Sequence, residues 1–244
     1  PRAHSSRKIQ VMKFTSEGPQ AVPLWIDGHP YLTLGHGLLD VVNPVTGIAL
    51  RRVPLSGADE AAVAIGAARA AGSDWAARSP AERQSLLSAL AQALAGLADH
   101  FAGLVGEETG ADEAVVAAEI AAVVAGLEHP GTRGSSGVTV VIGDAASPLG
   151  SVALPVAEAL AAGGTAVIKP SPRAPGAAYA FCELSARAGL PPGILNLVQG
   201  DEAAVEGLCA HAEVARLEYR GDAVLGERIG TIAARHGKAL CRGG

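Results

Sequence analysis

The stretch GVTVVIGDAASPLGSVALPVAEALAAGGTAVIKP, residues 137–170, decides the fold of this chain. It contains two short apolar runs, GVTVVI (137–142) and TAVIKP (165–170), with an alanine-rich helical segment (150–162) between them. Apolar runs of this length predict strands that are buried on both faces. A strand, a helix and a second strand form a right-handed crossover unit, which makes the two strands parallel.

The same alternation continues to the end of the chain. Beyond residue 170 the sequence predicts helices over 174–188, 201–210 and 223–235, and strands over 193–198, 214–219 and 238–241. Repeated units of this kind predict an α/β fold with a doubly wound parallel sheet and helices on both faces.

A short β entry segment (23–55) and three helices (57–128) are predicted to precede this alternation. In the entry segment, Asp27-Gly28 and Asn43-Pro44 mark turns between short strands. Ser56 and Asp59 resemble a capping box at the first helix start.

The second helix has the strongest start signal, because Ser79, Pro80 and Glu82 supply an N-cap, an N1 proline and a capping-box glutamate. Behind it one apolar stripe is typical of a single helix that packs on a core. The stripe consists of Leu86, Leu90, Leu94, Leu97 and Phe101. The third helix is predicted over 111–127 from similar spacing.

The domain organisation follows from these patterns. Residues 1–22 are polar and aperiodic, which predicts a flexible arm, and residues 23–244 form one domain with the βα alternation over 137–244. Because the chain starts at Pro1 instead of Met, the arm also fits a processed terminus or a piece of a longer protein.

Composition excludes several classes of function. The chain is 49% hydrophobic and 18% charged, which predicts a packed core, and its net charge of −5 gives no basic surface for nucleic acid. No apolar run reaches the roughly 18 residues that a membrane span needs, so cytoplasm is the expected location. The histidines show no HxxxH or HxH spacing, and Cys182, Cys209 and Cys241 are widely spaced, so no metal site is expected.

Ligands of a parallel sheet bind beyond the carboxyl ends of its strands. The loops at those ends are 143–150, 169–175, 200–202 and 220–226, and none carries a Rossmann or P-loop glycine fingerprint. Lys169 ends a strand, where its ammonium can reach a ribose hydroxyl or a phosphate, or extend as a surface lysine. Asp222 is explained as a helix N-cap. A nucleophilic role for Cys241 would rest on its residue type alone.

At this point the chain resembles the amino-terminal half of the aldehyde dehydrogenase superfamily. The most specific stretch is PVAEALAAGGTAVIKPSPRAPGAAYAFCELSARAGLPPGILNLVQGD (155–201), with weaker support from 40–55, from EETG (107–110), and from Tyr219 to Asp222 with Gly226. The resemblance implies an NAD(P) site without the glycine fingerprint and a Lys169 contact to the adenosine ribose. The candidate cofactor-binding residues are Lys169, Ser171, Gly200, Gly221 and Gly226.

Several positions depart from what the resemblance implies. Ala146 replaces the oxyanion-hole asparagine, and the loss of one such donor typically costs about 100-fold to 1,000-fold in rate. Pro172 replaces a glutamate that often pairs with the lysine at the ribose, Asp222 places a carboxylate against the phosphates, and Cys241 replaces the general-base glutamate. The family's nucleophilic cysteine belongs to a following domain, so no catalytic residue is assigned.

These departures favour a non-catalytic aldehyde-dehydrogenase-like domain with a structural or interaction role. Such domains resemble the vestigial carboxyl-terminal domains of long proline-utilization proteins and two-domain aldehyde dehydrogenases, so a protein partner or a parent polypeptide is expected. No cofactor is expected; if the chain binds one, NAD or NADP is expected. Two alternatives stay open: the NAD(P)-binding half of an enzyme whose catalytic half lies on another chain, and a regulatory nucleotide-binding module.

Only a short link precedes the strand at 138. The resemblance implies a longer insertion at this place, whose strands take part in oligomerisation, so the usual oligomer is not expected.

Overall fold

The computed structural model describes residues 19–33 and 37–243 of the chain. The predicted arm over 1–22 therefore falls mostly outside the described residues. At its end, the Val22 N–H donates to the Arg52 carbonyl (2.7 Å) and the Arg52 N–H to the Gln20 carbonyl (2.9 Å). These bonds attach residues 20–22 to the entry segment.

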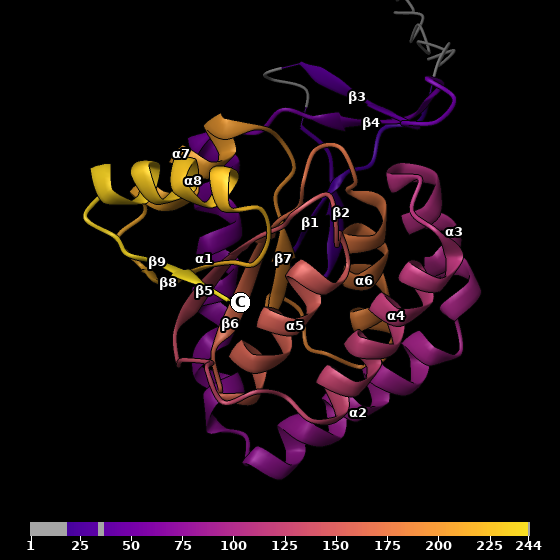
Figure 1. Cartoon of the computed structure of the whole chain (residues 1–244). Helices are drawn as coiled ribbons and strands as arrows, with labels where there is room; N and C mark the ends of the chain where they lie inside the picture. Colours follow the sequence, from indigo (N-terminus) through magenta and orange to yellow (C-terminus); the bar gives the residue numbers. More distant parts are fainter. Residues whose placement is uncertain (1–18, 34–36, 244) are drawn as a thin grey trace, which may run out of the picture.

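A seven-stranded sheet forms the centre of the molecule, with strand order β2-β1-β7-β6-β5-β8-β9 (Figure 1). The five strands from β7 to β9 are parallel, and β1 joins β7 in the antiparallel direction. The strands span Leu24–Ile26 (β1), His29–Tyr31 (β2), Val138–Ile142 (β5), Thr165–Lys169 (β6), Leu195–Leu197 (β7), Val214–Tyr219 (β8) and Leu240–Arg242 (β9). The doubly wound α/β architecture predicted from the sequence is confirmed.

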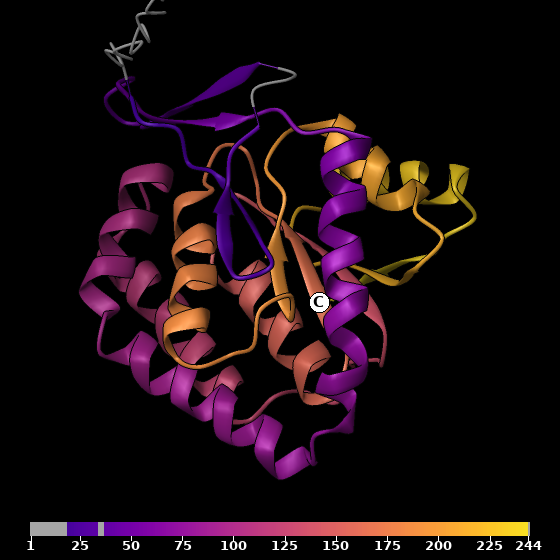
Figure 2. The same ribbon diagram turned by 180° about the vertical axis from the view of Figure 1, so that it is seen from behind.

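Helices cover both faces of the sheet, as the two opposite views show (Figures 1 and 2). One face carries α2 (Pro80–Ala95), α3 (Ala98–Thr109), α4 (Glu113–Glu128), α5 (Gly150–Ala161) and α6 (Gly176–Arg187). The other face carries α1 (Ala58–Ala77), α7 (Glu202–Ala210) and α8 (Ala223–Arg235).

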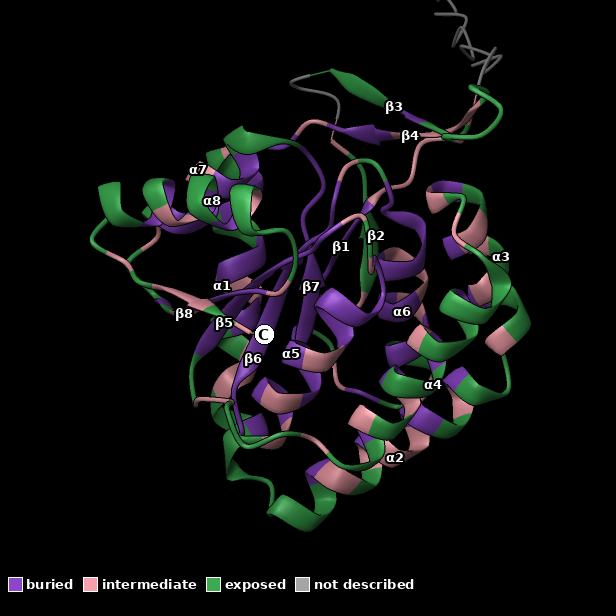
Figure 3. Cartoon of the chain, in the orientation of Figure 1, coloured by how far each residue is buried: buried purple, intermediate pink, exposed green. Residues whose placement is uncertain are grey.

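Alternate residues of the central strands supply the two cores, because successive side chains of a strand point to opposite faces. Val140 and Val167 pack under α1, α7 and α8, whereas Val141 and Ile168 pack under α5 and its neighbours. All five residues of β5 and of β6 are buried, which explains why most of their side chains are apolar (Figure 3).

The entry segment forms two hairpins. Asp27 (φ 53°) and Gly28 (φ 77°) make the tight turn between β1 and β2, with the positive φ values that such hairpin turns require. The second hairpin pairs β3 (Leu38–Val42) with β4 (Ala49–Pro54) in a separate two-stranded sheet, here called the β3–β4 ribbon. Most of β3 is exposed (Figure 3).

The helical region differs from the sequence prediction in one respect. Four helices, not three, lie between residues 57 and 128, because the predicted second helix divides at Gly96 and Leu97 into α2 and α3, which meet at a bend of 72°. Leu94 and Phe101 are buried on the two sides of the bend, while Leu97 is exposed. The apolar spacing therefore continues from α2 into α3 and gives no sign that the helix is interrupted.

The helix starts also test the predicted caps. The capping box of Ser79 and Glu82 is confirmed, since the Ser79 N–H donates to Glu82 (2.8 Å) and the Glu82 N–H to Ser79 Oγ (3.3 Å). In α1 the box lies one residue later than predicted. The Glu60 carboxylate, not Asp59, accepts the Gly57 N–H (2.8 Å), and it also accepts the Thr33 hydroxyl (2.7 Å).

The helices of the described residues include no single one that is long and apolar enough to cross a membrane. The bent pair of α2 and α3 reaches that length and composition only when the two helices are taken together.

Candidate functional site

A cavity of about 380 Å³ lies beyond the carboxyl ends of β5 and β6, between α7 and α8. This is the place where open parallel sheets bind ligands. Its lining consists of Ile142, Gly143, Lys169, Ser171, Pro172, Asp201, Glu202, Val205, Leu225, Arg228, Ile229 and Ile232. Two of the five predicted binding residues, Lys169 and Ser171, therefore meet at this cavity.

Lys169 ends β6 and is only 4% exposed. Burial lowers the pKa of its ammonium to about 8, and the nearby Asp201 carboxylate acts in the opposite direction. No hydrogen bond joins this ammonium to any of the described residues. A buried cation without such a bond, in the wall of a cavity, is suited to a hydroxyl or other oxygen of a ligand.

The three predicted glycines do not line this cavity. Gly200 has φ +121°, and a Cβ there would lie 2.8 Å from the Ser56 nitrogen, so glycine lets the loop pass close to the start of α1. A Cβ at Gly221 would collide with the Asp144 carboxylate, and one at Gly226 would lie 3.2 Å from the Tyr219 ring. At each of these three positions the absence of a Cβ leaves room for a neighbouring group.

Asp144, next to the lining residue Gly143, is a charged residue that the sequence analysis did not single out. It follows β5 and is 5% exposed. Its carboxylate accepts the Tyr219 hydroxyl (2.6 Å), the Asp222 N–H (3.1 Å) and the Ala146 N–H (2.7 Å). Burial, the largest influence, acts to raise the pKa of Asp144, but these hydrogen bonds and the Arg173 cation together outweigh burial, and the pKa is lowered. The sequence did contain a signal for it, because Asp144 follows a buried strand and a glycine, at the edge of the sheet where ligands bind.

The remaining departures occupy separate places. Ala146 is exposed, and its methyl group has no donor to offer. Pro172 lines the cavity, and Asp222 is the N-cap of α8, where its carboxylate accepts the Leu225 N–H (2.9 Å). Cys241 pairs with Glu218 in the register of β8 and β9 and lines a different cavity of about 390 Å³.

The other two thiols are poor nucleophiles. Cys182 and Cys209 are buried, and burial raises the pKa of Cys209 to about 11 and that of Cys182 still further. Within the described residues, no group of three or more His, Cys, Asp or Glu side chains is placed to hold a metal ion.

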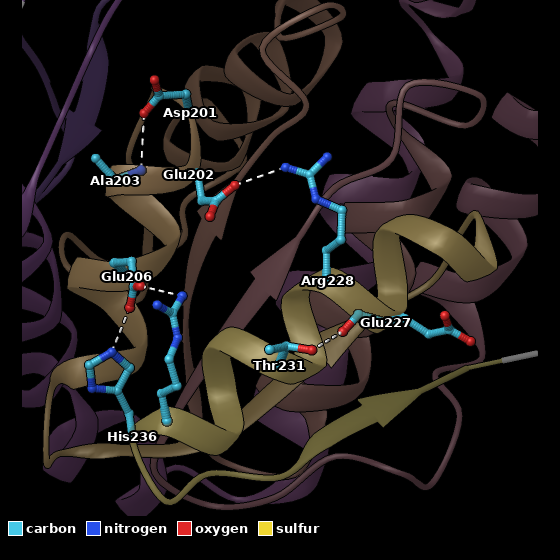
Figure 4. A network of polar contacts seen from close by, with 9 residues as sticks. Asp201, Glu202, Ala203, Glu206, Glu227, Arg228, Thr231 and His236 are labelled. Atoms are coloured by element: carbon cyan, nitrogen blue, oxygen red, sulfur yellow. Dashed lines mark hydrogen bonds and ion pairs between the residues drawn. The ribbon is translucent and has the colours of Figure 1, made fainter.

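Ion pairs join α7 to α8 beside the cavity (Figure 4). Arg228 of α8 lies 2.9 Å from Glu202 of α7, and Glu206 of α7 accepts contacts from His236 (2.6 Å) and Arg235 (2.5 Å) at the far end of α8. Glu202 and Arg228 also line the cavity, so each compensates the charge of the other there.

Carboxylates of the chain itself also occupy other helix N-termini. Glu119 of α4 accepts the N–H groups of Leu149 (2.9 Å) and Gly150 (2.7 Å) at the start of α5. Glu108 of α3 accepts the Gly176 N–H (2.9 Å) at the start of α6. The N-terminus of a helix is a place where phosphates often bind, so these bonds fill it with a carboxyl group of the chain instead.

The residues fit one end of a dinucleotide and not the other. The cavity and Lys169 suit the adenosine end. The carboxylates of Asp144 and Asp222 stand at the neighbouring strand ends, where a pyrophosphate would add further negative charge.

Comparison with known proteins gives the family of the chain. Human 2-aminomuconic semialdehyde dehydrogenase is 32% identical over 226 residues, which cover 83% of this chain and 46% of the human protein. Lactaldehyde dehydrogenase of Escherichia coli is 30% identical over 246 residues, which cover 91% of this chain and 51% of that protein. The chain therefore spans about half the length of these relatives.

Solved structures agree with this assignment. A crystal structure of lactaldehyde dehydrogenase from Escherichia coli matches 92% of this chain and 52% of its own, with a TM-score of 0.85 and 30% identity. Aldehyde dehydrogenase C of Pseudomonas syringae, solved with NAD⁺ and octanal, matches 90% of this chain and 49% of its own, with a TM-score of 0.80 and 28% identity. The model of the aldehyde dehydrogenase family matches residues 33–242, so the chain belongs to the aldehyde dehydrogenase family, as its sequence motifs predict.

Proposed function

We propose that this chain is a non-catalytic domain of the aldehyde dehydrogenase family with a structural or interaction role. The observation that carries the proposal is the buried Asp144 carboxylate, which bonds to Tyr219 and Asp222 across the ends of β5 and β8. Its lowered pKa keeps it ionised at neutral pH, so it opposes the phosphates of a dinucleotide.

The chemical groups for aldehyde oxidation are also missing from the expected positions. Ala146 has no hydrogen-bond donor in its side chain for an oxyanion, and the thiol Cys241 stands where a general-base carboxylate is expected from the resemblance. The high thiol pKa values of Cys182 and Cys209 leave little thiolate at neutral pH.

An interaction role is supported by the β3–β4 ribbon. Most of the exposed large apolar side chains of the described residues lie between Tyr31 and Ile48, and Val45 and Ile48 are 76% and 64% exposed. Exposed apolar groups that gather in one region favour contact with another polypeptide, either a partner or a further part of the same one.

The test is an activity assay of the chain with NAD and NADP and a panel of short aldehydes. Formation of the reduced nicotinamide is followed by absorbance, with Escherichia coli lactaldehyde dehydrogenase as the positive control. We expect no rate above the background without protein. A reproducible rate that depends on both the cofactor and the chain would refute the proposal.

A second candidate function is the NAD(P)-binding half of an enzyme whose catalytic residues come from another polypeptide. The cavity with Lys169 favours it, since the pocket is present although the other site residues differ. Calorimetry with NAD and with NADP tests it. Heat of binding at millimolar cofactor supports this second function, and its absence excludes it.

A further inference from the structure

The cavity between α7 and α8 has apolar walls and one buried cation. Val205 of α7 faces Ile229 and Ile232 of α8, and Lys169 closes the end at β6. Its volume of about 380 Å³ lies in the range of small-molecule sites, for which apolar walls and a few polar groups are typical. Such walls suit a flat aromatic ring, such as a nucleobase. The Lys169 ammonium suits the hydroxyl groups of a sugar attached to that ring.

The charges that line the cavity cancel. Lys169 and Arg228 are its cations, and Asp201 and Glu202 are its carboxylates. Arg228 is paired with Glu202 at 2.9 Å, and Asp201 is close enough to Lys169 to favour its charged form. No positive charge is therefore left over for a phosphate at these lining residues.

Two further carboxylates are bonded to or follow residues of the cavity lining. Asp144 follows the lining residue Gly143, and Asp222 accepts the N–H of the lining residue Leu225 (2.9 Å). The Asp222 N–H, at the start of α8, is itself bonded to Asp144 (3.1 Å). The N-terminus of α8, which would attract an anion, is thus filled by an internal one.

We propose that this cavity binds an uncharged ligand of nucleoside type and discriminates against the same nucleoside when it carries phosphate, so that NAD and NADP are poor ligands. The inference goes beyond the proposed non-catalytic role, because it assigns a ligand class to a site that the role leaves unused. It rests on the contrast between apolar walls with one buried cation, whose charge is balanced, and the Asp144 and Asp222 carboxylates next to the lining.

The experiment measures binding of adenosine, adenosine monophosphate and NAD to the whole chain by calorimetry at low ionic strength. We expect saturable binding of adenosine, and binding of the two phosphate-bearing ligands that is weaker by about tenfold or more. Added salt screens the Asp144 and Asp222 charges, so it should bring the affinities for adenosine and for its monophosphate closer together.

Two variants connect the result to the site. Asp222→Asn removes one carboxylate but keeps a good helix N-cap, so the fold is preserved and binding of the monophosphate should improve relative to adenosine. Asp74→Asn is the matched control, because Asp74 is exposed on α1, away from the cavity lining, and it should leave both affinities unchanged. Val205→Trp fills the cavity and should abolish adenosine binding.

The outcomes separate this inference from the proposed function. Equal or tighter binding of NAD than of adenosine, or an Asp222→Asn variant with the wild-type ratio, overturns the inference. Failure of all three ligands to bind also overturns it, yet leaves the non-catalytic role standing. Aldehyde-dependent reduction of NAD overturns the proposed function itself.

Discussion

The Tyr219 hydroxyl donates a 2.6 Å hydrogen bond to Oδ2 of Asp144 and so ties the end of β8 to the end of β5. Both residues are buried, at 2% and 5% exposure, and burial together with Asp144 raises the pKa of Tyr219, which stays neutral and donating. The bond fixes the position of the Asp144 carboxylate, which follows Gly143 of the cavity lining.

Tyr219→Phe is predicted to lower the free energy of unfolding at neutral pH by about 2 kcal/mol, because it removes a buried hydrogen bond to an ionised group. The pKa of Asp144 is lowered in the folded state, so its ionised form stabilises the protein above the ordinary pKa of aspartate, and this stabilisation is lost as pH falls. Urea unfolding should show the difference between wild type and variant shrinking below about pH 4. A constant difference at all pH values would contradict the assignment.

Gly221→Ala is predicted to destabilise the protein by about 1–3 kcal/mol, because the new Cβ collides with the Asp144 carboxylate. Gly221 does not have a positive φ, so the cost comes from this contact and not from backbone strain. The control is Gly103→Ala on α3, where no atom lies within 4 Å and alanine should stabilise the helix by about 0.5–1 kcal/mol. If thermal unfolding shows Gly221→Ala to be more stable than Gly103→Ala, the close contact between Gly221 and Asp144 is refuted.

Lys169→Met is predicted to stabilise the chain at neutral pH by up to about 3 kcal/mol, since it replaces a buried cation with an apolar side chain of similar length. The folded pKa of Lys169, about 8, lies below its ordinary value of 10.5. Wild type therefore gains stability as pH rises from about 8 to 10.5, and the advantage of the variant should diminish over that window. An advantage that does not change with pH would argue against a buried ammonium.

Glu108→Gln is predicted to change the pH dependence of stability between about pH 4.5 and 7. Burial raises the pKa of Glu108 to about 7, although Arg51, whose Nε lies 3.0 Å from it, and the Gly176 N–H act to lower it. The folded state thus holds a proton that the unfolded state has released, and ionisation costs wild type up to about 3 kcal/mol as pH rises.

The measurement for Glu108 is the difference in unfolding free energy between wild type and Glu108→Gln at several pH values. It should favour the variant progressively from pH 4.5 to 7 and then level off. Glu107→Gln is the control, because Glu107 contacts the same arginine (3.0 Å) but its side chain is 56% exposed. A similar pH profile for both variants would exclude the buried carboxyl group as the cause.

The sequence predicted the sheet well because its signals are local. Each parallel strand is an apolar run such as Val138–Ile142, and each following helix has its own start and length. The break at Gly96 and Leu97 was not predictable from spacing, because Leu94 and Phe101 stay buried on both sides of it.

The sequence identified lining residues of the cavity only where a single residue carries the signal. Lys169 could be identified from its place at the end of β6. The role of Asp144 depends on Tyr219, 75 residues away in the sequence, and that of Glu108 depends on Gly176, 68 residues away. Such contacts form only when the strands are ordered in the sheet, so no local pattern in the sequence predicts them.

The β3–β4 ribbon forms a sheet of its own, with exposed residues along most of β3, and its Arg51 and Arg52 side chains pair with Glu107, Glu108 and Asp40. Opening of the ribbon leaves the seven-stranded sheet and both cores in place. Amide protons of β3 therefore exchange with deuterated solvent through a local opening that costs only part of the global unfolding free energy, while those of β5 and β6 exchange last. A partner that covers the ribbon would slow exchange there first.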